Sequence, residues 1–154
     1  MKNSSSWMVT ASLNLFLVSF AQAQNTNMID IGPAAGDARA YFLKDTIKQV
    51  SPTVRSARII LSYQKARFGL DKNFNDDPNQ RHLSYGSTYY ANCTAHTTAQ
   101  SGSAMYSEGM GAGTIVKAFS ADVPPAKFYQ PLSQTSYDKI TSVIFKTICE
   151  YKIP

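Results

Sequence analysis

The chain contains two cysteines, Cys93 and Cys149, and a bond between them would tie the middle of the chain to its C-terminal end. Closing that loop would constrain the unfolded chain by roughly 4 kcal/mol in the chain-entropy model. The whole stability of a domain is about 5 to 15 kcal/mol, so such a bond would strongly limit the folds available. Cys93 lies in the stretch "YYANCTAHTTA" (residues 89–99), where it could be a nucleophile, a metal ligand or half of a disulfide.

The N-terminus indicates which of these roles is chemically sensible. "MKNSSSWMVTASLNLFLVSFAQAQ" has one early basic residue, an apolar run and the small-x-small sequence Ala21-Gln22-Ala23. This pattern predicts a secretory signal peptide over residues 1–23, because the apolar run is shorter than the ~20 residues that cross a bilayer. Export favours a disulfide over two free thiols. The expected first residue after cleavage is Gln24, so no lipoprotein cysteine is predicted there.

Removal of residues 1–23 from the chain of 154 leaves 131 residues and lowers the formal charge from +5 to +4, because Lys2 is lost. This length predicts one domain. Residues 24–36 contain Gly, Pro and polar side chains and are expected to form a flexible lead-in, followed by a domain over 37–154. The segment 38–50, "ARAYFLKDTIKQV", fits either a strand or a helix.

Two segments show the alternation of strands. Residues 55–66 place Ala57, Ile59, Leu61 and Tyr63 on one face. Residues 69–81, "GLDKNFNDDPNQR", are rich in turn formers and predict a loop. Residues 84–97 place Cys93 among the odd positions, which we expect to be the buried face, and His96 on the opposite face.

The C-terminal third predicts a hairpin and then a helix. "AMYSE" and "TIVKAFS" read as strands around the turn "GMGAG" at 109–113. Past Pro124-Pro125, apolar residues recur at helical spacing through residues 133–151, with Ser133 or Ser136 as the N-cap. A helix packed on the odd face of the sheet would bring Cys149 toward Cys93, which favours a disulfide between them.

The competing chemistries have weaker support. A zinc site would need all four of Cys93, Cys149, His82 and His96, so no metal is expected. A cysteine nucleophile is disfavoured, since a thiol facing the core in an oxidising compartment is inert and His96 lies on the other face. Ser107 lacks the glycine that opens a G-x-S-x-G elbow, and we predict no catalytic residue and no cofactor.

Two further patterns suggest ligands only weakly. Asp71, Asn73 and Asn75 resemble the start of a calcium loop, but Asp76 and His82 stand where glycine and glutamate are needed. Residues 37–67 carry an excess of basic side chains, which could attract an acidic glycan or simply meet solvent. These basic residues are Arg39, Lys44, Lys48, Arg55, Arg58, Lys65 and Arg67. Nucleic acid is not an expected partner of an exported chain.

The order of three motifs resembles the surface-adhesin protein E-like domains of Gram-negative bacteria. They are "SYGSTYYANC" on a strand, "YSEGMGAGTIV" across a hairpin, and "FYQPLSQTSYDKITSVIFKTIC" leading into a helix that ends in cysteine. The likeness covers residues 37–151. It implies an α+β fold, in which a small antiparallel sheet carries a C-terminal helix on one face and one disulfide joins Cys93 to Cys149.

The resemblance also implies a binding function without catalysis, namely attachment to host extracellular-matrix components. The alternative is a periplasmic, envelope-associated accessory protein with no host ligand, and the cell surface, the periplasm and the medium all stay open as locations. If the helix covers the odd face, the even face is predicted to be the binding face for a matrix protein, an acidic glycan, an envelope protein or a second subunit. Its residues are Arg58, Gln64, Thr88, Tyr90, Asn92, Thr94 and His96.

Overall fold

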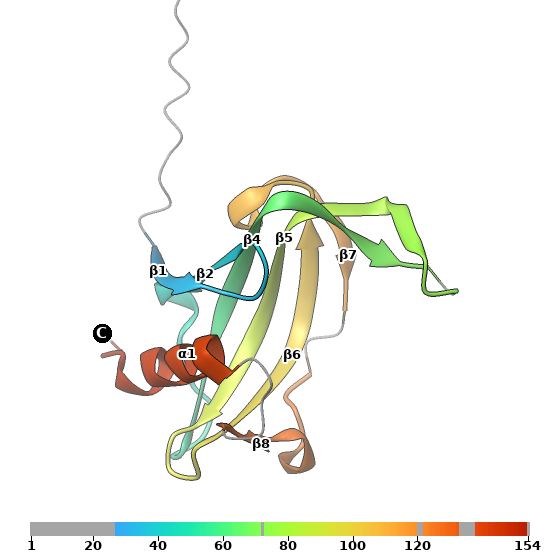
Figure 1. The fold of residues 1–154 in the computed structure, drawn as a ribbon. Helices are drawn as coiled ribbons and strands as arrows, with labels where there is room; N and C mark the ends of the chain where they lie inside the picture. The colour runs from blue at the N-terminus through green and yellow to red at the C-terminus, as the bar shows by residue number, and fades with distance from the viewer. Residues whose placement is uncertain (1–26, 72, 120–121, 133–137, 154) are drawn as a thin grey trace, which may run out of the picture.

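The computed structural model describes residues 27–71, 73–119, 122–132 and 138–153. In this part of the chain eight strands form one antiparallel sheet in the order β1-β2-β4-β5-β6-β7, with β3 paired to β4 and β8 (Gln130–Pro131) paired to β6. Helix α1 lies on one face of this sheet (Figure 1). The predicted α+β class, with one C-terminal helix on an antiparallel sheet, is confirmed.

The N-terminal part of the sheet differs from the expected flexible lead-in. Strand β1 (Met28–Pro33) pairs with β2 (Ala38–Leu43), so the sheet begins nine residues before the predicted domain boundary at 37. The apolar side chains of Ile29 and Ile31 pack against the core. The expectation of a flexible segment rested on the polar residues around them. The ambiguous segment 38–50 contains β2, a 3-10 turn η1 (Lys44–Thr46) and the short strand β3 (Lys48–Gln49).

Strands β4 (Val54–Leu70) and β5 (Asp76–Asn92) are the longest in the sheet, with 17 residues each. The predicted loop over 69–81 is wrong in extent, since only residues 71–75 lie between the two strands. Side-chain hydrogen bonds keep its polar residues within the hairpin: Asp77 accepts from the side chain of Gln80 at 2.7 Å and from the backbone N–H of Asn79 at 2.9 Å.

The outer ends of β4 and β5 form a two-stranded ribbon, residues 64–83, which we call the hairpin arm. The pairing of β2 with β4 ends at Tyr63, and that of β6 with β5 ends at Ser84. Beyond these positions the arm bends away from the rest of the sheet and projects to one side (Figure 1). Asp71 accepts the backbone N–H groups of Asn73 and Asn75 at its tip, at 2.7 and 2.9 Å.

Strand β5 ends at Asn92, earlier than the predicted strand over 84–97. Residues 93–96 form a turn, in which the Asn92 side chain accepts the Ala95 N–H at 3.0 Å and His96 has a left-handed φ of 53°. The turn ends the alternation, so His96 does not lie on the even face. Its ring packs against Phe145 of the helix, with centroids 5.5 Å apart.

The segment after β6 (Thr97–Tyr106) is broader than the tight hairpin turn predicted for 109–113. The 3-10 turn η2 (Gly109–Gly111) separates β6 from β7 (Ile115–Ala118) and folds back over the face of the sheet opposite α1. Ser62 and Ser84 hold it there by accepting the N–H groups of Met110 and Gly111, at 3.1 and 2.9 Å. Gly111 has φ +72° and lies close to Ile60, which is therefore buried on that face.

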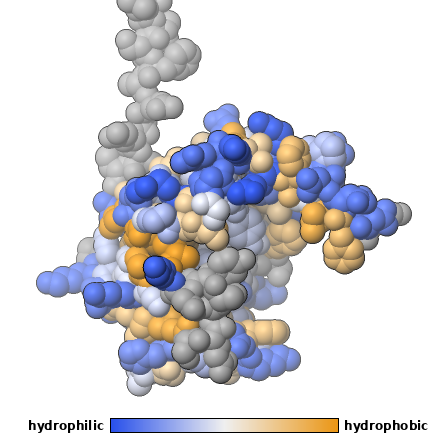
Figure 2. Space-filling view, viewed as in Figure 1, coloured by the Kyte–Doolittle hydropathy of each residue, from blue (hydrophilic) through white to orange (hydrophobic). Residues whose placement is uncertain are grey.

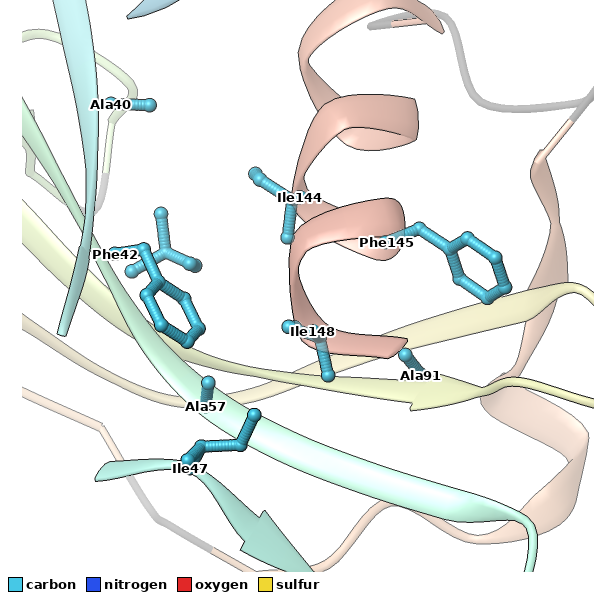
Figure 3. Close-up of a cluster of buried hydrophobic side chains, with 9 residues drawn as sticks. Ala40, Phe42, Ile47, Ala57, Ala91, Ile144, Phe145 and Ile148 are labelled. Carbon is cyan, nitrogen blue, oxygen red and sulfur yellow. The ribbon is translucent and has the colours of Figure 1, made fainter. Parts of the chain in front are cut away.

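Helix α1 (Asp138–Glu150) supplies the other half of the core. Ile144 and Ile148 point from the helix toward the sheet, as Figure 3 shows, and are 1% and 0% exposed. They meet a floor of small side chains, Ala40, Ala57 and Ala91, which lets the helix approach the strands closely. The predicted N-cap candidates Ser133 and Ser136 lie outside the described residues.

The two cysteines form the disulfide that was expected. The sulfurs of Cys93 and Cys149 are 2.08 Å apart and the Cα atoms 5.7 Å apart, at a sequence separation of 56. Strand β5 ends just before Cys93, and α1 ends just after Cys149, so the bond fixes the last turn of the helix to the end of a central strand. None of the described helices is long and apolar enough to cross a membrane.

Candidate functional site: the tyrosine groove

The helix is too short to cover the face on which it lies. Thirteen helical residues span about 20 Å, whereas the 17 residues of β4 or β5 span about 56 Å when extended. Part of the odd face therefore extends beyond the helix toward the hairpin arm. The side chains on this part are those that alternation had assigned to a buried face.

This uncovered part forms a groove of about 900 Å³, which we call the tyrosine groove. Three tyrosines from the central strands line it together with apolar side chains from the arm, the helix and η3 (Ala126–Phe128). Its volume lies at the upper end of the range for small-molecule sites. The side chains that shape it are Leu61, Tyr63, Phe68, Leu70, Tyr85, Tyr89, Met105, Phe128, Ile140 and Ile144, with Arg67, His82, Thr98, Gln100, Gln130 and Thr141 as polar members.

The Tyr89 hydroxyl lies in a poorly solvated part of the groove. Burial raises the pKa of Tyr89 to about 12, and the nearby Tyr85 and Tyr63 raise it further in the same direction. The Tyr89 hydroxyl is therefore neutral at physiological pH and can donate or accept a hydrogen bond. A tyrosine in this setting presents a large apolar ring together with one polar atom.

The arm side of the groove is fixed by ionic contacts to the turn between β1 and β2. Asp37 accepts the backbone N–H of Lys65 at 2.8 Å and a bond from Arg67 at 2.5 Å. The Lys65 N–H and the Arg67 guanidinium lower the pKa of Asp37. Arg67 also lies over the ring of Tyr63, with its central carbon 5.4 Å from the ring centroid. These contacts hold the arm beside the β1–β2 turn, whose residues 34–36 line the groove.

His82 is the most buried ionisable side chain in the groove, with an exposed fraction of 5%. Its ring packs edge-on against Tyr63, with centroids 5.9 Å apart. Nδ1 lies 2.9 Å from the backbone carbonyl of Gln80, and because a carbonyl can only accept, Nδ1 carries the proton. With that proton on Nδ1, Nε2 is the acceptor nitrogen of a neutral ring.

The even face, predicted as a continuous binding face, is interrupted in the structure. Tyr90 is 6% exposed and so is not available at the surface, and His96 lies beside the helix. Arg58 donates to the hydroxyl of Tyr106 at 2.6 Å, and η2 covers the sheet around Ile60. The remaining predicted members, Gln64, Thr88, Asn92 and Thr94, are exposed or half-buried. A role for them in binding stays a prediction.

The basic excess in residues 37–67 is largely used within the chain. Arg39 pairs with Asp30 at 2.7 Å, and Arg67 pairs with Asp37. Arg55 donates to the carbonyls of Ile148, Cys149 and Tyr151, at 3.4, 2.9 and 3.0 Å, and thereby caps the end of α1. Together with the Arg58–Tyr106 contact, these bonds give four of the seven basic side chains a structural partner.

Sequence reasoning missed the groove because it assumed that the helix covers the whole odd face. It placed Tyr63, Tyr85 and Tyr89 on that face correctly, but treated them as core. It weighed His82 only as a zinc ligand and as a departure from the calcium-loop pattern. A comparison of the helix length with the length of the strands would have indicated that a tyrosine-rich part of the sheet stays uncovered.

The geometry defines a disulfide-linked, antiparallel-sheet domain with one helix laid across part of one face. Comparison with known structures identifies the same fold in protein E of Haemophilus influenzae. A crystal structure from a non-typeable strain matches at 14% sequence identity with a TM-score of 0.53, covering 82% of this chain and 78% of that chain. The selenomethionine form of the Haemophilus protein matches at 13% identity with a TM-score of 0.51, covering 82% and 88%.

The family is shown by the sequence itself. The surface-adhesin protein E model matches residues 29–150, and the chain belongs to this family. The predicted resemblance is therefore confirmed, and the match also includes β1, which the sequence analysis had left outside the domain. A comparison with curated proteins found no match. The family is one of exported surface adhesins, a class of proteins that bind rather than catalyse.

Proposed function

We propose that this chain is an exported adhesin-like protein that attaches to a host extracellular-matrix component through the tyrosine groove, without catalysis. The groove is the observation that carries the proposal. Aromatic side chains are enriched where proteins bind partners, and a groove of this size remains open beside the only described α-helix. Membership of an adhesin family favours a macromolecular partner.

Exposed apolar side chains extend the groove along the arm. Phe68 and Leu70 are 41% and 51% exposed, and both line the groove. Figure 2 shows hydrophobic residues on the projecting arm beside hydrophilic ones. Contiguous exposed apolar patches mark interaction sites, whereas single exposed apolar residues are common on any protein surface.

The test is attachment of the exported protein to a panel of immobilised matrix proteins. We expect Leu70→Asp to weaken attachment at least tenfold, since it places a charge on the apolar mouth. Ile115→Asp is the matched control, because Ile115 is a strand residue with 61% exposure that does not line the groove. Equal binding by the two variants would place the attachment site elsewhere.

The alternative, an envelope-associated accessory protein inside the periplasm, makes a different prediction about location. An adhesin is digested by protease added to intact cells or is recovered from the medium. A periplasmic protein is protected until the outer membrane is permeabilised. Protection on intact cells, together with an envelope protein crosslinked to the groove, would replace the adhesin function with the accessory one.

A further inference from the structure

We propose that the tyrosine groove binds an uncharged oligosaccharide and that Nε2 of His82 accepts a hydrogen bond from a sugar hydroxyl. This inference rests on the proposed function, because it names the ligand class of the same groove. The ligand would be a glycan carried by the matrix partner or presented alone. Three features of the lining lead to this class of ligand.

The first feature is an acceptor without a donor. Among the residues that the structure describes, His82 makes one hydrogen bond, through Nδ1. Every side-chain nitrogen or oxygen sealed from solvent in the described part of the chain has a partner, so Nε2, for which no partner is seen, is not sealed, and the residue that carries it lines the groove. A ligand that covers His82 must supply a donor, because an unpaired buried acceptor costs about 1 to 3 kcal/mol.

The second feature is the alternation of ring faces with polar groups. Tyr63, Tyr85 and Tyr89 provide apolar rings on neighbouring strands. Gln100, which pairs with Tyr89 across the sheet and donates to the Ser87 hydroxyl, and Gln130 add amide groups to the lining. A pyranose ring has an apolar C–H face and a rim of hydroxyls that donate and accept. Such a ring can lie on a tyrosine while its rim reaches the amides and His82.

The third feature is the lack of free charge. No carboxylate and no lysine belongs to the described lining, and the one guanidinium, that of Arg67, is paired with Asp37. An acidic ligand would therefore find no uncompensated cation in the groove. This favours an uncharged glycan over the acidic glycan that the basic segment had suggested.

Other occupants fit these features less well. An acyl chain would fill the apolar volume but would leave Nε2 of His82 and the Tyr89 hydroxyl without partners. A peptide could donate through its backbone N–H groups, but it lacks the repeated rim of hydroxyls opposite Gln100 and Gln130. The experiment below includes both as competitors.

Tyrosine fluorescence of the mature protein gives a direct titration, because Trp7, the only tryptophan, lies in the predicted signal peptide. The probes are uncharged tetrasaccharides built from glucose, galactose or N-acetylglucosamine, with a hyaluronan tetrasaccharide, lauric acid and an unglycosylated apolar peptide for comparison. We expect at least one uncharged tetrasaccharide to bind more tightly than the three comparison probes. Tighter binding by lauric acid or by the peptide would overturn the glycan assignment.

His82→Phe removes Nε2 and keeps a ring against Tyr63, so we expect the affinity for the tetrasaccharide to fall about three- to tenfold. His96→Phe is the matched control, since it changes the other histidine, which packs on Phe145 outside the groove. Thermal unfolding of both variants checks that they fold. Equal affinities for wild type and a folded His82→Phe variant would refute the role of His82.

Enzymatic removal of glycans from the matrix proteins separates this inference from the proposed function. If attachment is lost with the glycans and is weakened by Leu70→Asp, both stand. If attachment survives deglycosylation but is weakened by Leu70→Asp, the groove is a binding site for protein and the glycan inference fails alone. If Leu70→Asp has no effect on attachment, both fail.

Discussion

At the scale of single residues, the arginines make structural hydrogen bonds and ion pairs that the charge pattern of the sequence does not predict. Arg55 lies on β4 but donates to three carbonyls at and beyond the end of α1. Helix C-termini leave carbonyls without intrahelical partners and carry partial negative charge, so a guanidinium there satisfies both needs. The sheet thereby holds the end of the helix next to the disulfide.

Arg55→Met should lower the free energy of unfolding by about 1 to 3 kcal/mol, because it leaves charge-assisted bonds to the helix carbonyls unmade. Urea denaturation measures this change. Arg39→Met is the matched control, since it removes only an exposed ion pair to Asp30, which contributes little to stability. A loss no greater in Arg55→Met than in Arg39→Met would contradict a capping role for Arg55.

Tyr89 should reveal its burial on alkaline titration. Its pKa is raised to about 12 in the folded protein, above the value of 10.0 expected in the unfolded chain. The pKa difference of Tyr89 between the folded and unfolded states therefore contributes stability that is fully present below pH 10 and is lost as the pH rises from 10 toward 12. In ultraviolet titration of the folded protein, Tyr89→Phe should remove one late ionisation step that Tyr41→Phe leaves in place.

Burial also raises the pKa of Tyr90 and Tyr129, so the late part of the titration contains more than one group. The difference between the wild-type curve and the Tyr89→Phe curve isolates the tyrosine of the groove. If the hydroxyl missing from the Tyr89→Phe curve instead ionised near pH 10, Tyr89 would be open to solvent, which would contradict its buried position in the groove.

At the scale of elements, three carboxylates organise the hairpin arm. Asp71 accepts two N–H groups at the tip, Asp77 accepts from Gln80 and Asn79, and Asp37 joins the arm to the β1–β2 turn. Backbone N–H bonds lower the pKa of Asp71 and of Asp37, and the Gln80 amide lowers that of Asp77. The arm lacks the strand neighbours that the rest of β4 and β5 have, so these bonds matter more there.

The arm should therefore loosen before the rest of the sheet in acid. A carboxylate whose pKa is lowered in the folded state stabilises the fold at pH values above its ordinary pKa of 3.8. This stabilisation is lost as the pH falls through the pKa of the folded state. Hydrogen exchange followed from pH 5 down to pH 2 should show earlier loss of protection in residues 64–83 than in β6. Asp71→Asn should produce part of this loss at neutral pH, whereas Asp45→Asn, outside the arm, should not. Simultaneous loss of protection in the arm and in β6 would contradict this order.

At the scale of the whole molecule, one covalent bond joins the two halves of the core. The disulfide closes a loop with a sequence separation of 56, and its removal should cost roughly 4 kcal/mol, as an upper value, through the entropy of the unfolded chain. The double variant Cys93→Ala, Cys149→Ala should show this as a lower midpoint in thermal or urea unfolding. A stability unchanged within about 0.5 kcal/mol would indicate that packing alone holds the helix in place.

The double variant also tests how the groove is maintained. Ile140 and Ile144 of the helix line the groove, and the helix is fixed by the disulfide at one end. In the folded double variant we therefore expect the late ionisation of Tyr89 to shift toward pH 10 as the helix gains freedom. A retained late step would show that contacts with the sheet suffice to position the helix.

The sequence alone determined the features that depend on local pattern and on chemistry. Alternation assigned the faces of β4 and of β5 as far as Asn92, helical spacing located α1, and two cysteines in an exported chain indicated their bond. Motif order identified the family. These features were predictable because neighbouring residues along the chain decide them.

Only the tertiary structure decided which parts of those faces are covered. It continued the strands through the turn-rich segment 69–81, added β1 to the sheet, folded η2 onto Ile60 and turned His96 toward the helix. Each of these depends on partners far away in sequence, such as Ser62 with Met110 or Arg67 with Asp37. The tyrosine groove has the same origin, since it exists because a short helix crosses long strands, and local sequence patterns do not fix where it crosses.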